Sequence, residues 1–128
     1  MTDGEIRKIN IPAAFDRISE PWSPHVAARL NGQDVRLVKL EGAFDWHRHA
    51  GADEAFFVVK GAFAMGLREG GAEREIALGE GDLIVVPAGV EHRPRAETEC
   101  WVMLFEPSET VNTGEKETAR TKRDLPML

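Results

Sequence analysis

The sequence contains a single cysteine, Cys100, so the chain cannot form an internal disulfide bond. Its apolar runs are far shorter than the roughly 20 residues that a membrane-spanning helix needs. Residues 1–5 also lack the basic and apolar regions of a secretion signal. These absences lead us to expect a cytoplasmic protein. Cys100 lies in an apolar stretch without a neighbouring base, which favours a packed thiol over a nucleophile.

Basic residues are neither in excess nor clustered. The chain has 16 Lys and Arg residues against 22 Asp and Glu residues, which gives a formal net charge of −6. Apart from a short run at residues 120–123, positive charge is spread along the whole chain. A nucleic-acid-binding surface needs a concentrated basic patch. We therefore expect no nucleic-acid partner, and the lack of an apolar span argues against a membrane partner.

No long segment between residues 30 and 106 has helical periodicity, which excludes the alternating strands and helices of a parallel α/β sheet. Short apolar stretches instead alternate with turn signals such as Asn31-Gly32 and Gly70-Gly71. Strands of this length and spacing predict an all-β sandwich or barrel. The predicted strands cover residues 35–40, 43–49, 54–60, 62–68, 75–78, 82–86 and 99–105.

The flanking segments are less regular than this central region. Residues 12–18 begin with a proline, which an early helical position tolerates, and they predict one or two helical turns that cover the core. After Glu106 the composition indicates a C-terminal arm at residues 107–128, with an ordered first half and a partly mobile remainder. A chain of 128 residues with 42% hydrophobic residues can bury one core. We expect a single domain with its core at residues 30–106.

Three of the four histidines fall where they can share a metal ion. His47 and His49 are separated by one residue, so on an extended strand their side chains point to the same face, roughly 6.6 Å apart. His92 follows the turn Pro87-Ala88-Gly89, in which the glycine permits a sharp reversal of the chain. His25 lies among prolines outside this pattern, and we leave it out of the predicted site.

Two adjacent carboxylates, Asp53 and Glu54, compete to be a fourth ligand, and the pattern alone does not separate them. We favour Glu54, because on a strand it shares a face with Phe56 and Val58, which would line a partly dry site. Met103 is a further candidate for this substrate-pocket lining. The predicted metal ligands are His47, His49, Glu54 and His92.

Three imidazoles and one carboxylate suit Fe(II), Mn(II), Ni(II), Co(II) or Zn(II). They disfavour Mg and Ca, which prefer oxygen ligands. Four protein ligands leave up to two open positions on an octahedral ion, where a substrate or dioxygen can bind. The spacing identifies no separate acid or base, so no catalytic residue other than the ligands is predicted.

The same residues resemble the two motifs of the cupin superfamily. The first motif joins a glycine, His-x-His, a glutamate and a second glycine, and it appears here as Gly42, His47, His49, Glu54 and Gly61. The spacing from Gly42 to His47 is slightly shorter than in the motif.

The second motif joins a glycine, Pro-x-Gly, a histidine and an asparagine. It appears here as Gly81, Pro87, Gly89 and His92, with Ala96 in place of the asparagine. The two motifs together span residues 42–96, a little under half of the chain. This combined spacing makes a chance match an unlikely explanation.

The resemblance implies a double-stranded β-helix, a small jelly-roll barrel with the metal inside. More narrowly, the chain looks like small single-domain bacterial cupins that are often labelled mannose-6-phosphate-isomerase-like, a family name more than an established activity. The implied function is that of a metal-dependent small-molecule enzyme, of dioxygenase or isomerase type. The alternative is a non-catalytic cupin that binds or senses a small ligand. Small cupins form dimers, so we expect a homodimer whose contacts come from residues before Val35 and after Glu106.

Overall fold

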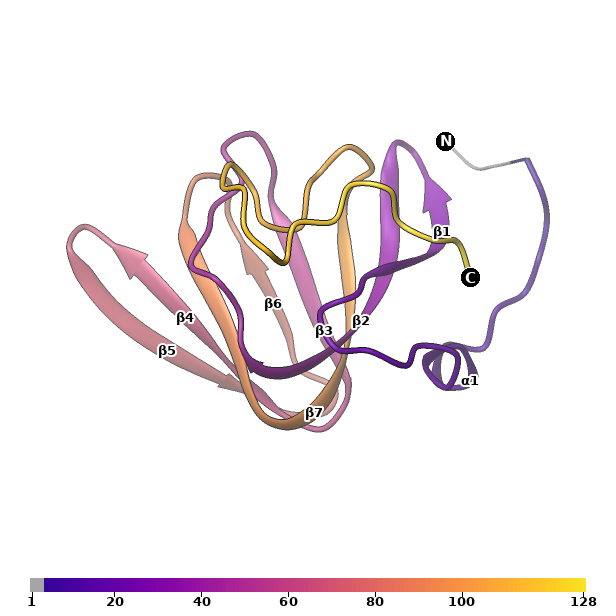
Figure 1. Ribbon diagram of the computed structural model, residues 1–128, viewed down its shortest axis with the longest axis horizontal. Helices are drawn as coiled ribbons and strands as arrows, with labels where there is room; N and C mark the ends of the chain where they lie inside the picture. Colours follow the sequence, from indigo (N-terminus) through magenta and orange to yellow (C-terminus); the bar gives the residue numbers. More distant parts are fainter. Residues whose placement is uncertain (1–3) are drawn as a thin grey trace.

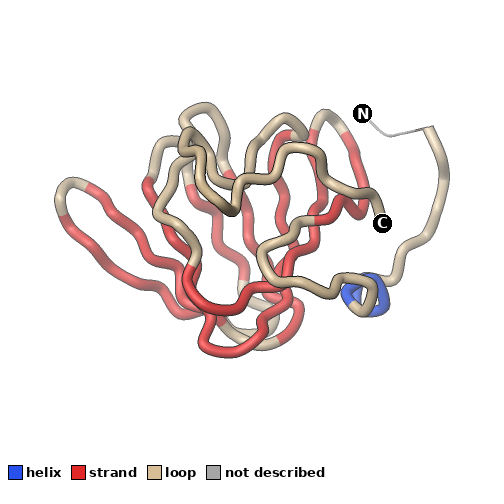
Figure 2. Tube along the Cα trace, viewed as in Figure 1, coloured by secondary structure: helices blue, strands red, loops and turns tan. Residues whose placement is uncertain are grey.

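Antiparallel strands make up most of the computed structural model, which describes residues 4–128 (Figure 2). A short helix, α1 (Ile11–Phe15), precedes them. The strands are β1 (His25–Leu30), β2 (Gln33–Ala43), β3 (Glu54–Lys60), β4 (Phe63–Glu69), β5 (Ala72–Leu78), β6 (Leu83–Val86) and β7 (Glu91–Pro107). Within residues 4–128, no helix is long and apolar enough to cross a lipid bilayer.

The long strand β7 closes the sheet into a barrel. The strand order is β1-β2-β7-β3-β6, with β4 added to β7 and β5 beside β4. The first part of β7 pairs with β4, its last part pairs with β3, and β2 follows it along most of its length. Because β7 bends between these two parts, the sheet curls around a common interior, and the β4–β5 hairpin projects from its side (Figure 1).

The turn between β1 and β2 follows directly from its sequence. Asn31 and Gly32 have φ angles of +53° and +75°. These left-handed angles are what a two-residue hairpin turn requires, and Asn-Gly is a favoured pair for it. The register is set here, because Leu30 pairs with Gln33 across the turn.

The predicted N-terminal helix is confirmed as the short helix α1. The side chain of Asn10 accepts a hydrogen bond of 2.9 Å from the backbone N–H of Ala13, which caps the first turn. Pro12 lies in that first turn, where a missing N–H costs nothing. Phe15 ends the helix and stacks on Trp101 of β7, with ring centroids 4.9 Å apart.

Two hydrophobic clusters lie on opposite faces of the sheet. The inner cluster fills the barrel and includes Phe56, Val58, Met65, Val102 and Leu104. The outer cluster lies under α1 and consists of Ala14, Phe15, Ile18, Ala27 and Leu37. Along β7 the residues alternate between the two clusters, since Trp101 and Met103 pack against the outer one. Cys100 is buried in the inner cluster, where burial raises the pKa of its thiol to about 11.

The strand predicted at residues 43–49 does not form. β2 ends at Ala43, and the following residues run as a loop in which His47 makes an isolated bridge to His92. The backbone oxygen of Arg48 faces the C-terminal arm and accepts from Glu115 N at 3.4 Å. The arm therefore lies where a strand would need its next hydrogen-bonding partner.

The strands β7 and β1 also differ from the prediction. β7 begins at Glu91 rather than at residue 99, because its first part pairs with β4 even though Pro94 lacks an N–H to donate. β1 was not predicted, since its apolar pattern is short and directly follows a proline-rich stretch.

The C-terminal arm crosses one end of the barrel, at the top of the view in Figure 1. The hydroxyl of Thr118 donates to the carboxylate of Asp45 at 2.8 Å. At the end of the chain, Leu128 N donates to Val26 O at 2.9 Å. The arm thus contacts both β1 and the loop that follows β2.

Candidate metal centre

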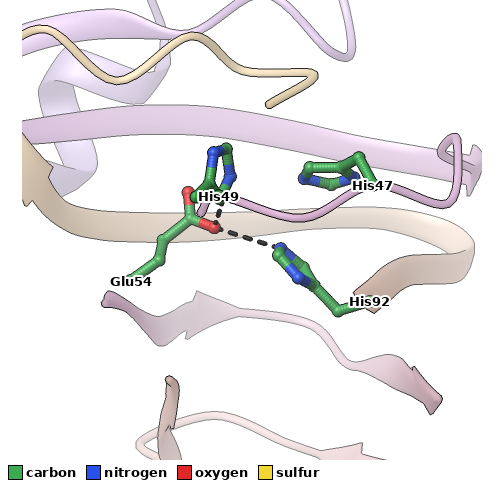
Figure 3. Close-up of side chains that lie close together, drawn as sticks. All are labelled: His47, His49, Glu54 and His92. Atoms are coloured by element: carbon green, nitrogen blue, oxygen red, sulfur yellow. Dashed lines mark hydrogen bonds and ion pairs between the residues drawn. The ribbon is translucent and has the colours of Figure 1, made fainter. Parts of the chain in front are cut away.

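Three imidazoles and one carboxylate converge inside the barrel (Figure 3). His47 and His49 come from the loop after β2, Glu54 is the first residue of β3, and His92 lies at the start of β7. All four side chains are buried. One ligand atom from each residue lies within 4.8 Å of those from the other three. The structure therefore brings together the four residues that the sequence predicted as ligands.

Backbone hydrogen bonds hold the histidine segments against each other. His47 N donates to His92 O at 3.0 Å, and His92 N donates to His47 O at 2.8 Å. Gly89, in the turn before β7, has a φ of +84° and donates its N–H to His49 O at 2.9 Å. The left-handed angle at Gly89 is what allows this turn to reach back to the histidine loop.

Two of the imidazoles are oriented by backbone carbonyls. Nδ1 of His47 lies 2.8 Å from Asp45 O, and Nδ1 of His92 lies 2.9 Å from Val90 O. A carbonyl oxygen only accepts, so each Nδ1 carries a proton, and in a neutral ring Nε2 keeps a lone pair. This is the arrangement that orients histidine ligands at metal sites.

Glu54 occupies the centre of the cluster. Its Oε1 lies 3.2 Å from His92 Nε2 and 3.3 Å from His49 Nε2. The contact with His49 lacks hydrogen-bonding geometry, so this buried Nε2 has no hydrogen-bond partner. A buried ring nitrogen without a partner is costly in the absence of another ligand.

The adjacent carboxylate has a different role. Asp53 Oδ1 accepts a hydrogen bond of 2.8 Å from Ala88 N, within the turn that precedes β7. Of the two carboxylates that the sequence left open, the structure brings Glu54 to the cluster and uses Asp53 to fix a turn. His25 also lies apart, at the start of β1, with Nδ1 2.8 Å from Ser23 O.

His47 and Glu54 both have pKa values below their usual range. Burial, reinforced by the like charge of His92, lowers the pKa of His47 to about 4. Burial by itself raises the pKa of Glu54, but the close contacts with the imidazoles of His49 and His92 outweigh it and hold that pKa well below its usual range. At neutral pH the cluster therefore offers a neutral His47 imidazole and an ionised carboxylate, as metal coordination requires.

These residues fit a first-row transition metal. Nitrogen and oxygen ligands lie about 2.0–2.2 Å from such an ion, so two of them on opposite sides are about 4.4 Å apart. The four ligand atoms, all within 4.8 Å of one another, lie close to that spacing. The partnerless Nε2 of His49 gains a partner when an ion is bound. The donor set is suited to a metal ion without selecting one element.

A small cavity of about 40 Å³ adjoins the cluster. Its walls are mostly apolar, and they include Trp22, Phe44, Phe56 and Leu104 beside His47 and Glu54. Phe56, predicted as pocket lining, lies there with its ring 6.0 Å from the ring of His92. Val58 is packed in the inner cluster instead, and Met103 lies on the opposite face of β7.

A larger groove of about 690 Å³ lies outside the barrel, between the histidine loop and the β4–β5 hairpin. Charged side chains such as Arg48, Arg68 and Glu115 line it. His47 lines both the groove and the inner cavity. The groove therefore leads from the surface to one edge of the cluster.

A second buried polar cluster, which was not predicted from the sequence, lies beside the first. Arg36 Nε donates to Asp34 at 3.0 Å, and Arg36 Nη1 donates to Glu106 at 3.0 Å. All three residues are at most 2% exposed. Asp34 and Arg36 occupy alternate positions on β2, and Val38 and Leu40 continue the same inner face. This alternation is the sequence signal that could have identified the two β2 residues as buried.

A small antiparallel barrel that holds three imidazoles and a carboxylate in its interior defines a class of metal-binding β-barrel proteins. The chain belongs to the cupin domain family Cupin_2, which matches residues 34–106.

Solved structures of bacterial relatives share the fold. A protein with a cupin-2 domain from Shewanella frigidimarina is 41% identical, with a TM-score of 0.73 over 77% of this chain and 93% of that one. A protein from Neisseria meningitidis is 35% identical, with a TM-score of 0.71 over 79% of this chain and 99% of that one. The double-stranded β-helix predicted from the sequence is therefore confirmed.

Curated relatives with a named activity match a shorter part of the chain. A segment of 51 residues is 47% identical to acireductone dioxygenase from Rhodopseudomonas palustris. The segment covers 40% of this chain and 30% of that enzyme.

Proposed function

We propose that the protein is a metal-dependent enzyme of dioxygenase type that acts on a small oxygen-bearing molecule. His47, His49, Glu54 and His92 hold a divalent first-row transition metal in this proposal. The observation that carries it is the convergence of these four buried side chains within 4.8 Å, with the Nε2 of His49 left unpartnered. Without a cation, the buried carboxylate of Glu54 would have no positive charge beside it, and the Nε2 atom of His49 would have no hydrogen-bond partner.

The comparison with acireductone dioxygenase supports oxygen chemistry over isomerisation. The 47% identity extends over 51 residues only, so it bears on the barrel and the site rather than on the whole enzyme. Its substrate is not carried over, because a shared fold hosts many activities.

The chain's own residues prepare the site in three ways. The carbonyls of Asp45 and Val90 fix the imidazoles of His47 and His92 in the tautomer that binds a metal through Nε2. Glu54 supplies a negative charge, and apolar walls such as Phe56 limit the entry of water. When bound, the metal polarises a ligand oxygen or activates dioxygen.

Elemental analysis and oxygen uptake test the proposal together. Protein purified without chelator should contain about one transition-metal ion per chain, and the His49→Ala and Glu54→Ala variants should lose most of it. Oxygen uptake by the metal-loaded protein is then measured with small catechols, enediols and diketones, with Asp53→Ala as the matched carboxylate control. Metal retention by both ligand variants would contradict the assigned site.

The same assay separates the enzyme from a non-catalytic binding protein. Uptake of oxygen with at least one compound class supports the dioxygenase. Tight, saturable ligand binding without oxygen uptake or product formation would support the binding or sensing cupin instead.

We also propose that the protein acts as a homodimer. The large apolar residues Leu83, Val85 and Phe105 are between 37% and 61% exposed, and two of them lie on the edge strand β6. Exposed apolar residues on an edge strand need cover, and a second copy of the chain would supply it. Light scattering should give the mass of two chains, and a monomeric mass would contradict this assembly.

A further inference from the structure

Glu106 is the one residue of the second polar cluster that also lines the cavity of the candidate metal centre. It lies on the last part of β7, where Ala55 pairs with Phe105 and Phe56 pairs with Leu104. The same register sets Glu106 beside Glu54 on the inner face of the barrel. Glu106 is only 1% exposed, so its carboxyl group faces the cavity and not the solvent.

Arg36 fixes one oxygen of this carboxyl group. Its Nη1 donates to Glu106 Oε1 at 3.0 Å and to Thr110 O at 2.8 Å. Its other nitrogens donate to Asp34 and to Ser108 O, at 3.0 Å and 2.9 Å. Arg36 is therefore held on several sides, and it holds Glu106 in one orientation.

The other oxygen of Glu106 has no hydrogen-bond partner. Oε2 is buried and has no hydrogen bond of good geometry, although the carboxyl group interacts with the neighbouring Glu54 and its Oε1 accepts from Arg36. Buried polar atoms are nearly always satisfied, and an exception calls for a missing partner. The oxygen belongs to a side chain that lines the cavity beside His47 and Glu54.

We propose that Glu106 binds the ligand of the metal centre through a hydrogen bond from Oε2 to a hydroxyl group. This inference rests on the proposed metal site. It assigns the ligand class as a small molecule that carries a hydroxyl group next to its metal-binding oxygen atoms. A hydroxyl group both donates and accepts, so it pairs with a carboxyl group in either protonation state.

The rest of the cavity supports a small ligand with few polar groups. Trp22, Val38, Phe44 and Leu104 offer apolar surface, and the cavity measures about 40 Å³. Binding sites for drug-sized ligands are about 300–1,000 Å³. Glu106 therefore selects among compact ligands by a single hydroxyl group.

Two probes of matched shape test this role with Co(II)-loaded protein. Glycerate and 2-hydroxybutanoate both chelate a metal through a carboxylate and the adjacent hydroxyl, but only glycerate has a further hydroxyl where the other has a methyl. Their dissociation constants are measured from the visible absorption of Co(II). Wild-type protein should bind glycerate at least about tenfold more tightly, as expected for a hydrogen bond to a buried carboxyl group.

The Glu106→Met variant should lose this preference, with the two constants equal within about twofold, while its affinity for 2-hydroxybutanoate and for Co(II) stays unchanged. It should fold, because Arg36 keeps Asp34 and two backbone carbonyls as partners. Glu106→Gln should keep most of the preference, since an amide also pairs with a hydroxyl. The exposed residue Glu109 provides a matched control, Glu109→Gln, with no effect.

Each other outcome overturns the inference in a recognisable way. A glycerate preference that survives in Glu106→Met, or that is absent from the wild type, would contradict the proposed hydrogen bond to Oε2. A large loss of Co(II) affinity in Glu106→Met makes Glu106 a metal ligand instead. Failure of the wild type to bind Co(II) removes the proposed function itself, which is distinguishable because it precedes any probe measurement.

Discussion

Two buried polar clusters lie side by side in this barrel, and they are satisfied in different ways. In the cluster of Asp34, Arg36 and Glu106, the guanidinium group supplies the positive charge and donates to both carboxyl groups. In the cluster of His47, His49, Glu54 and His92, the carboxylate faces imidazoles of which one nitrogen has no partner. The first cluster carries its own cation, whereas the second is suited to a bound one.

The difference separates a structural role from a binding role. Hydrogen bonds from Ser108, Arg36 and Arg29 outweigh the effect of burial and lower the pKa of Asp34. Burial and the neighbouring Glu54 carboxylate raise the pKa of Glu106 well above its usual range. Mutations of Asp34 and Arg36 should therefore affect the stability of the fold, whereas mutations of the histidine cluster should affect metal affinity.

Removal of the Arg36 guanidinium group should have the largest effect. In Arg36→Met the buried Asp34 carboxylate loses its fully buried partner, and loss of one member of a buried ion pair costs about 3–5 kcal/mol. Urea unfolding should show this loss, with metal content per folded chain unchanged. The half-exposed partner in Arg29→Met should cost less than about 1 kcal/mol. A loss of less than about 1 kcal/mol in Arg36→Met would contradict the structural role.

Removal of a metal ligand should give the opposite pattern. Four ligands together bind structural zinc with about 10–16 kcal/mol, so loss of one ligand in Glu54→Ala should weaken metal binding by roughly 2.5–4 kcal/mol, or about 70- to 900-fold. The free energy of unfolding of the metal-free variant should lie within about 1 kcal/mol of that of the metal-free wild type, because the substitution removes a buried charge along with its contacts. Competition with a chelator measures the affinity. Equal metal affinity in variant and wild type would place the ion elsewhere.

Acid should destabilise the metal-free protein through His47. The pKa of His47 is about 4 in the folded chain, against an ordinary value of 6.5. Between pH 6.5 and pH 4 the imidazole is therefore protonated in the unfolded chain but stays neutral in the folded chain. The free energy of unfolding should thus fall by about 3 kcal/mol from pH 6.5 to pH 4. Glu106 has a raised pKa, so its protonation in acid favours the folded chain and opposes this effect. The quantity to measure is therefore the difference in unfolding free energy between wild type and His47→Gln at each pH. Parallel pH profiles would contradict the shift.

Asp53→Ala should have the smallest effect and sharpens the contrast with its neighbour Glu54. Loss of the hydrogen bond to Ala88 N should cost about 1 kcal/mol of stability, measured by thermal unfolding. Metal affinity should fall by less than about tenfold, because the turn before His92 is loosened while the ligands remain. A loss as large as that in Glu54→Ala would show that Asp53 coordinates the ion.

The sequence was sufficient to predict the four residues that converge in the barrel, because their placement depends on local spacing. His47 and His49 lie one residue apart in a segment that keeps both rings buried, and the turn at Gly89 determines where His92 re-enters the sheet. That spacing survives although residues 44–49 form a loop instead of the predicted strand.

Long-range contacts explain what the sequence did not reveal. Met103 was predicted to line the pocket, but β7 alternates and turns this side chain toward the outer cluster. Glu106 and Arg36 lie 70 positions apart, and only the pairing of β2 with β7 brings them together. Strand pairing of this kind has no local signal, so a buried ion pair between distant strands is visible only in the folded chain.

X-ray absorption at the metal edge of the loaded protein most directly tests whether the histidine cluster holds the ion. The first shell should contain three imidazole nitrogens and a carboxylate oxygen at about 2.0–2.2 Å, with the imidazole signal reduced by one ring in His49→Ala. A first shell built from oxygen alone, or an imidazole signal that is unchanged in His49→Ala, would contradict the account.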